Sequence, residues 1–191
     1  MNGKLSDQPP NPWSAIKRVL RYAALASLVT SLVFVWMLLS KPTLPPAEAS
    51  AEAAASFAEK IARLTRAHEL GAASEVHFTA AEINSQIQEW LKTSPPPDSG
   101  TTVKNGAVAL EDDRLIAVLT LDVKGIELYL TVNGRLNFAS HSVRLVPSEI
   151  RIGKVAAPVA WFERKIDMHM ELPEAVAAIR VEHGELVIEA Q

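Results

Sequence analysis

The side chains that could carry out chemistry are scattered along this 191-residue sequence. It has no HExxH motif, no histidines at i, i+4, no G-x-S-x-G elbow, no glycine-rich phosphate loop and no cysteine. The adjacent carboxylates Asp112 and Asp113 lie between two alternating segments, where they favour a turn over an acid/base site. We therefore expect a non-catalytic protein with no catalytic residues, no metal and no cofactor. The five histidines are His68, His77, His141, His169 and His183.

Two short motifs leave other interpretations open. His169 lies between two methionines, and with a carboxylate and a hydroxyl from elsewhere it could build an envelope hydrolase, because triads assemble in space. This is the least favoured function class. Trp161 and Phe162 are adjacent aromatic residues that could enter a bilayer or cap a lipid groove, whereas core packing is their ordinary role.

The dominant feature of the sequence is Tyr22 to Ser40, which carries no charge over 19 residues. A helix needs about 20 apolar residues to cross roughly 30 Å of hydrocarbon. Lys17, Arg18 and Arg21 precede the segment and only Lys41 follows it closely, so residues 1–21 are predicted to form a cytoplasmic tail. The sequence thus predicts a single-pass protein of the cytoplasmic (inner) membrane, with its C-terminal domain periplasmic or extracellular.

A cleaved signal peptide is the alternative for this N-terminal segment. Its elements are present, because basic residues and an apolar run precede the small-residue triplet Ala47-Glu48-Ala49. However, the apolar run is longer than the usual 7–15 residues of a signal peptide, and the triplet lies well beyond it, after several prolines. An uncleaved anchor is therefore favoured.

The net charge of −3 is unevenly distributed. Residues 1–46 contain five basic residues and one acidic residue, which leaves a net charge of −7 on the rest of the chain. Nucleic-acid binding requires a basic face, so no nucleic-acid partner is expected.

Two helices are predicted after the proline-rich spacer 41–46. Residues 47–71 form an alanine-rich amphipathic helix with a stripe of Phe57, Ile61 and Leu64; it could serve as a stalk or self-association helix, or pack on the domain behind it. Residues 72–191 then form an exported α+β domain. Its first helix begins at a capping box between Thr79 and Glu82, stapled by Phe78 and Ile83. That helix ends before Pro95-Pro96-Pro97, and its apolar stripe comprises Ile83, Ile87, Trp90 and Leu91.

Alternating residues over 108–152 predict an antiparallel meander with long strands at 114–123 and 126–138. A short helix follows Pro158 and runs through Trp161, Phe162 and Ile166, and a second helix is predicted over Glu174 to Ile179. The chain closes with a hairpin around His183-Gly184, in which Leu186 and Ile188 are expected to face inward. The predicted fold class is α+β, with a single N-terminal transmembrane helix followed by a curved antiparallel sheet wrapped on helices.

The sequence resembles the YpmS-like membrane-anchored envelope proteins in the order of its segments. These are an N-terminal anchor, a helix start with the sequence FTAAEIN, alternating strands, the segment PSEIRIGKVAAP and a second helix start at LPEAV. More distantly, it resembles bacterial relatives of the tubular lipid-binding superfamily. The resemblance covers roughly Phe78 to Ala190 and implies an apolar groove able to hold acyl chains. The residues expected to line such a groove are Ile83, Ile87, Leu91, Leu119, Leu121, Leu128 and Leu130.

Together these observations predict a membrane-anchored, non-catalytic envelope protein whose exported domain binds lipid or another apolar ligand. The alternative is an envelope interaction module that assembles through the 47–70 helix, as a homo-oligomer or with an envelope partner.

Overall fold

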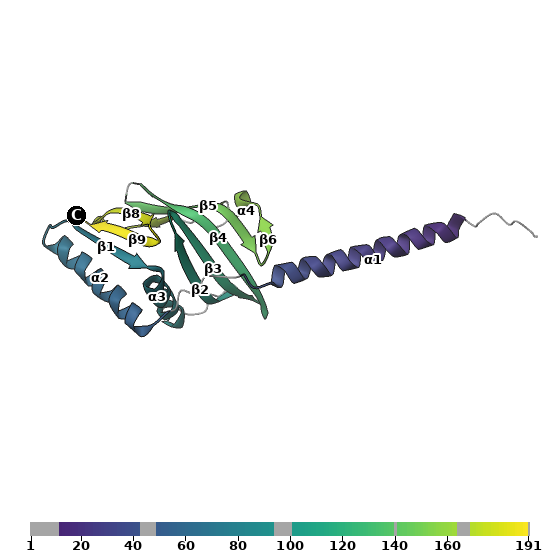
Figure 1. The fold of residues 1–191 in the computed structure, drawn as a ribbon, viewed down its shortest axis with the longest axis horizontal. Helices are drawn as coiled ribbons and strands as arrows, with labels where there is room; N and C mark the ends of the chain where they lie inside the picture. Colours follow the sequence, from purple (N-terminus) through teal and green to yellow (C-terminus); the bar gives the residue numbers. More distant parts are fainter. Residues whose placement is uncertain (1–11, 43–48, 94–100, 140, 164–168, 191) are drawn as a thin grey trace, which may run out of the picture. The chain divides into compact units, whose positions relative to one another are not determined.

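The computed structural model describes residues 12–42, 49–93, 101–139, 141–163 and 169–190. The chain forms two compact units, Met1–Met37 and Leu38–Gln191. The larger unit contains two antiparallel sheets with the helices α2, α3 and α4 (Figure 1). The expected class, α+β with antiparallel sheets, is therefore confirmed.

Helix α1 spans Pro12–Leu39 and begins ten residues before the apolar segment. Within it, the 18 residues Tyr22–Leu39 are apolar enough to cross a membrane, and none is buried inside the protein. The Thr30 hydroxyl donates to the carbonyl of Ala26 at 2.8 Å, so this polar group is satisfied within the helix. Of the expected tail, residues 1–11 lie outside the described part, and residues 12–21 belong to the helix.

Helix α2 spans Ala51–Glu69 and starts later than the predicted position 47. Ser50 is its N-cap, because its hydroxyl accepts from the amide of Ala53 at 3.0 Å. The helix ends in a Schellman motif, in which Gly71 adopts φ of 61° and the amide of Ala72 reaches the carbonyl of Ala67 at 2.9 Å. Residues 43–48, which include most of the predicted spacer, lie outside the described residues.

The smaller sheet has the strand order β1-β9-β8, with β1 at Ser74–Thr79, β8 at Val176–Glu182 and β9 at Glu185–Ala190. The predicted hairpin at His183-Gly184 is confirmed. The predicted helix over Glu174 to Ile179 is wrong, because β8 pairs with β9 there and this pairing overrides the helical propensity of the alanines. In β9, Leu186 and Ile188 lie opposite Phe78 and Val76, the buried residues of β1, so they face the inner side as expected, although both stay partly exposed. Val187 is fully buried on the other face, between His77 and Arg180.

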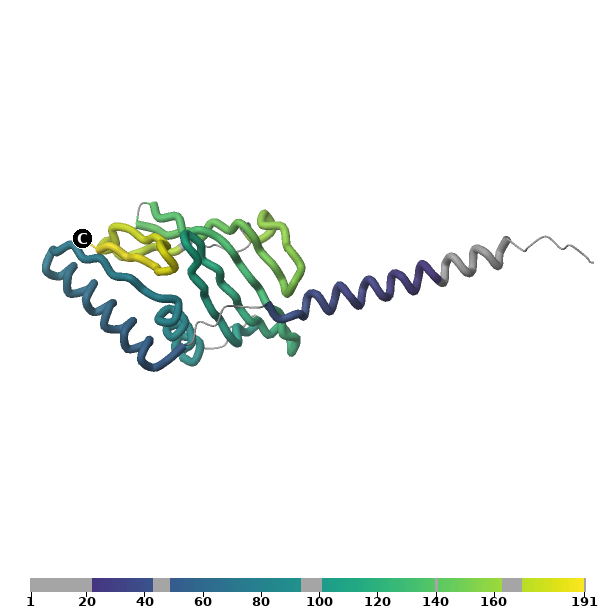
Figure 2. Tube along the Cα trace, in the orientation of Figure 1, coloured from purple at the N-terminus to yellow at the C-terminus, as the bar shows by residue number. Residues whose placement is uncertain are grey.

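The larger sheet is the predicted meander, and Figure 2 shows its successive hairpins. Its order is β2-β3-β4-β5-β6, and β7 at His169–Glu171 also pairs with β5. The strand bounds are β2 Thr101–Glu111, β3 Arg114–Val123, β4 Ile126–Ala139, β5 Ser142–Ile152 and β6 Val155–Ala157.

Helix α3 spans Ala80–Thr93, and α4 spans Val159–Glu163. The capping box of α3 is confirmed: the Thr79 amide donates to the Glu82 carboxylate at 2.8 Å, and the Glu82 amide donates to the Thr79 hydroxyl at 3.3 Å. Trp90 was expected on the buried stripe, but it is 59% exposed. The predicted continuation of α4 to Ile166 lies outside the described residues.

Cross-strand pairing assigns the side chains of the larger sheet to two faces, because directly opposed residues lie on the same face. We call one the apolar face; its central positions are Leu119, Leu121, Leu128, Leu130, Val132, Ile150 and Ile152. The opposite, polar face carries Ile116, Val118, Thr131, Asn133, Glu149 and Arg151. Leu130, Val132 and Ile150 are the buried core of the apolar face, onto which α4 packs Val159 and Phe162.

Candidate ligand-binding face

The structure brings most of the predicted groove-lining residues together on the apolar face. A Cβ atom built on Gly106 of β2 would lie 3.0 Å from Ile87, 3.3 Å from Leu119 and 3.9 Å from Leu91. Helix α3 therefore rests directly on the sheet where β2 lacks a side chain. Leu119, Leu121 and Leu130 belong to the core cluster, and Leu128 is paired with Leu121 on the same face. Ile83 is partly exposed on α3.

Helix α3 also carries polar side chains that sequence reasoning missed. The side-chain nitrogen of Asn84 donates to the backbone carbonyl of Val108 at 2.9 Å. The side-chain oxygen of Asn84 accepts from the backbone N–H of Val108 at 2.6 Å. One turn later, Gln88 donates to the carbonyl of Gly106 at 2.9 Å. The i, i+4 spacing on the helix, about 6 Å, matches the i, i+2 spacing of the strand, so these side chains cover the edge of β2. The sequence signal for this contact was the i, i+4 spacing of Asn84 and Gln88. It could not be interpreted, because β2 was predicted only from position 108 and its partner residue Gly106 lay outside the predicted strand.

Glu82 joins α2 to the start of α3. Its carboxylate, 6% exposed, accepts from the Lys60 ammonium at 2.6 Å and from the Ser56 hydroxyl. Burial alone would raise the pKa of Glu82, but hydrogen bonds from Lys60, Ser56 and the Thr79 amide outweigh it and lower the pKa to about 2. Glu82 is therefore a structural anion that clamps α2 in place.

Helix α2 packs on its neighbours, with Phe57 against Phe78 at 4.9 Å between ring centroids. The predicted stripe is thus divided: Phe57 faces the interior, whereas Ile61 is 39% exposed. Ile61 and Leu64 line a mostly apolar hollow of about 450 Å³, together with Pro173, Val176 and Ile188.

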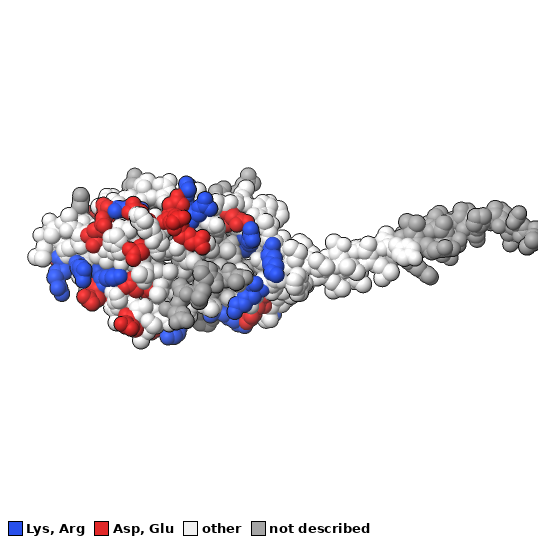
Figure 3. Space-filling model, in the orientation of Figure 1, with Lys and Arg blue, Asp and Glu red and all other residues white. Residues whose placement is uncertain are grey.

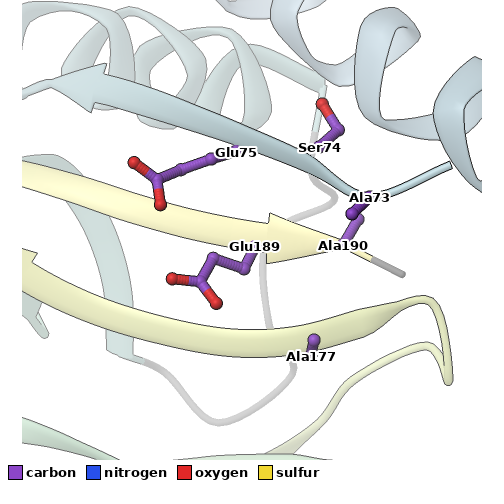
Figure 4. Close-up of a pocket in the computed structure, with 6 residues that line it drawn as sticks. All are labelled: Ala73, Ser74, Glu75, Ala177, Glu189 and Ala190. Carbon is purple, nitrogen blue, oxygen red and sulfur yellow. The ribbon is translucent and has the colours of Figure 1, made fainter.

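A charged network covers the outer face of the smaller sheet. His77 on β1 lies 2.9 Å from Glu75 and 3.0 Å from Glu185 of β9, and these two hydrogen bonds raise its pKa. Arg180 on β8 pairs with Glu75, Glu182 and Glu189. At one end of this face, Glu75 and Glu189 line a hollow of about 400 Å³, with their carboxylates directed to the same side (Figure 4). Both carboxylates share Arg180 with Glu182, so this network holds more carboxylates than cations.

The remaining candidates for chemistry have structural roles or lie outside the described side chains. Asp113 pairs with Arg135 at 2.7 Å beside the β2–β3 turn, as expected for a turn residue. Trp161 is 69% exposed, whereas its neighbour Phe162 packs on the core. The side chain of His169 is not described. Within the described ranges, no group of three or more histidine, aspartate or glutamate side chains is placed to hold a metal ion.

Comparison with family models, with curated proteins and with solved structures finds no match to this chain. The fold and the described site therefore define the class on their own: an α+β protein with two antiparallel sheets and one N-terminal helix long and apolar enough to span a membrane.

Proposed function

We propose that this chain is a membrane-anchored, non-catalytic envelope protein whose apolar sheet face binds an acyl chain or another apolar ligand. In this proposal α1 spans the cytoplasmic membrane once, with its N-terminus in the cytoplasm. The uncharged stretch Tyr22–Leu39 and the cations that precede it support this topology. Figure 3 shows the contrast between the uncharged described part of α1 and the mixed charges of the larger unit.

The observation that carries the proposal is the incomplete burial of the apolar face. Leu119 lies in the middle of β3, and Leu121 and Leu128 lie toward the turn between β3 and β4, yet all three remain partly exposed. The face continues to Ile126, which is 56% exposed. Removing such carbon surface from water is worth about 25 cal/mol per Å², and an acyl chain laid along the face would gain this free energy.

Site-specific photocrosslinking of the full-length chain tests this function. The photoreactive residue p-benzoylphenylalanine is introduced at Leu128 on the apolar face or at its neighbour Tyr129 on the opposite face. Both positions are partly exposed, so they form a matched pair. Membranes from expressing cells are irradiated, and the peptide is analysed by mass spectrometry.

Lipid adducts at position 128 that are absent at position 129 are the expected result. Absence of lipid adducts at position 128 would contradict the proposal. A protein adduct at Ile61 in a third variant, without lipid at position 128, would favour assembly through α2 instead.

A further inference from the structure

A second pocket lies on the polar face of the larger sheet, opposite the apolar face. It has a volume of about 490 Å³. Its floor is formed by two cross-strand rows, Ile116–Asn133–Glu149 and Thr131–Arg151. The turn residues Gly153 and Lys154 and the segment Lys41–Pro42 complete the lining.

Two residues that line this pocket carry a polar atom without a hydrogen-bond partner in the described part of the chain. The Thr131 hydroxyl oxygen and the Asn133 side-chain carbonyl oxygen are both buried, and neither has a hydrogen-bond partner among the described residues. Burying such groups without a partner costs free energy, so they are normally satisfied by protein, water or ligand. Thr131 and Asn133 occupy alternate positions of β4, on the same face, and both residues line this pocket.

The charges around these atoms define the chemistry of the ligand. Lys41, Arg151 and Lys154 are cationic, and Glu149 is the single carboxylate among the lining residues. Glu149 is paired with Arg151 at 2.6 Å, and the lining residues together include three cationic side chains and one carboxylate. A phosphate ester can accept hydrogen bonds from the cationic side chains and from the Thr131 hydroxyl. An ammonium or hydroxyl group on the same ligand can donate to the Glu149 carboxylate and the Asn133 side-chain oxygen.

We propose that the polar-face pocket binds a phosphate ester that also carries a hydrogen-bond donor, as the phosphoethanolamine and phosphoglycerol head groups of membrane lipids do. Lys41 is two residues beyond the end of α1 in the sequence. If α1 spans the membrane, as proposed above, the chain enters the pocket lining within two residues of the membrane-crossing helix, which favours lipid head groups as the source of the phosphate ester. Only the assignment of the phosphate ester to membrane lipids rests on the proposed function. The inference that the pocket binds a phosphate ester does not.

The test uses the full-length chain in dodecylmaltoside micelles and three probes: phosphatidylethanolamine, soluble glycerophosphoethanolamine and inorganic phosphate. Binding is measured by calorimetry for the soluble probes and by native mass spectrometry for the lipid. The pocket variants are Arg151→Gln and Thr131→Val. The matched control is Arg144→Gln, which makes the same charge change on the same strand outside the pocket lining.

We expect at least tenfold weaker binding in Arg151→Gln and several-fold weaker binding in Thr131→Val, with no change in Arg144→Gln. Thr131→Val should also raise the melting temperature without ligand, because a methyl group replaces an unpartnered hydroxyl; this readout shows that the variant is folded. Inorganic phosphate that binds as tightly, with the same dependence on the variants, would support the pocket but assign it to free phosphate. Absence of binding for all three probes, or equal effects of Arg151→Gln and Arg144→Gln, would overturn the proposal. Lipid adducts at position 128 report on the apolar face, whereas Arg151→Gln reports on the polar-face pocket, so each proposal can fail separately.

Discussion

The side chain of Asn84 forms two hydrogen bonds with the backbone of Val108, at 2.6 and 2.9 Å, and so takes the place of a neighbouring strand at the edge of β2. Asn84 is itself buried on α3. An open sheet edge is a template for pairing with another chain, and here Asn84, together with Gln88, blocks it. The contact between α3 and the sheet is therefore specified by polar as well as apolar side chains.

Replacement of Asn84 by leucine should destabilise the protein by about 2–4 kcal/mol, because the amide and carbonyl of Val108 both lose their partner. It should also increase aggregation by freeing the edge. Urea denaturation and light scattering measure the two effects. Gln86→Leu is the control, because Gln86 is an exposed neighbour on α3. A stability of Asn84→Leu equal to that of the control would contradict the edge role.

The Glu82 network makes stability depend on acid. The pKa of Glu82 falls from 4.5 to about 2 on folding, so its contribution is present above pH 4.5 and is lost as the pH falls toward 2. By linkage, a shift of this size corresponds to a contribution on the order of 3 kcal/mol. Thermal denaturation between pH 7 and pH 2 should show this decline.

Glu82→Gln should remove that part of the acid dependence and cost about 3–5 kcal/mol at pH 7, because the Lys60 ammonium loses its buried partner. Glu59→Gln is the matched control: Glu59 pairs with Arg63 at 3.6 Å but is 76% exposed, so its removal should change stability by less than about 0.5 kcal/mol. If the stability of Glu82→Gln fell between pH 4.5 and pH 2 as much as that of the unaltered protein, another group would be responsible for the acid dependence.

Gly106 should be sensitive to the smallest possible change. A methyl group at this position meets Ile87 at 3.0 Å, so Gly106→Ala should cost about 1–2 kcal/mol through overpacking. In an Ile87→Ala background the same change should become neutral or stabilising, since the clashing atom is gone. A double-mutant cycle by urea denaturation measures this coupling. Additive effects would mean that α3 does not rest on Gly106.

The pKa of His77 should be raised above 6.5 by its hydrogen bonds to Glu75 and Glu185. Arg180 faces the same network from β8 and remains charged throughout. Because the folded pKa is raised, the stabilisation is fully present below pH 6.5 and is lost as the pH rises through the raised value. NMR titration of the imidazole should show a lower pKa in Glu185→Gln and little change in Glu182→Gln, whose carboxylate pairs with Arg180 rather than His77. Equal titration in both variants would contradict the assignment.

Local patterns were sufficient for the elements whose signals lie within a few residues. Several elements were readable from the sequence: the capping box at Thr79 and Glu82, the turns at Asp112-Asp113 and His183-Gly184, and the long strands β3 and β4. Caps, turns and alternation depend on neighbours in the sequence. The uncharged segment that became α1 was equally clear, since length and composition define a membrane-crossing helix.

Tertiary structure decided what depends on distant partners. Strand β1 pairs with β9, more than 100 residues later, and residues 176–179 became a strand because β9 lies beside them. Neither the pairing of Asn84 with Val108 nor that of Lys60 with Glu82 could be read from the sequence, because each side chain is common on solvent-exposed helices. The same holds for the polar-face pocket, whose residues come from β3, β4, β5 and the segment after α1. The sequence alone determined where the chain turns, caps and could cross a membrane; the fold determined which polar groups are buried together, because that depends on contacts between residues far apart along the chain.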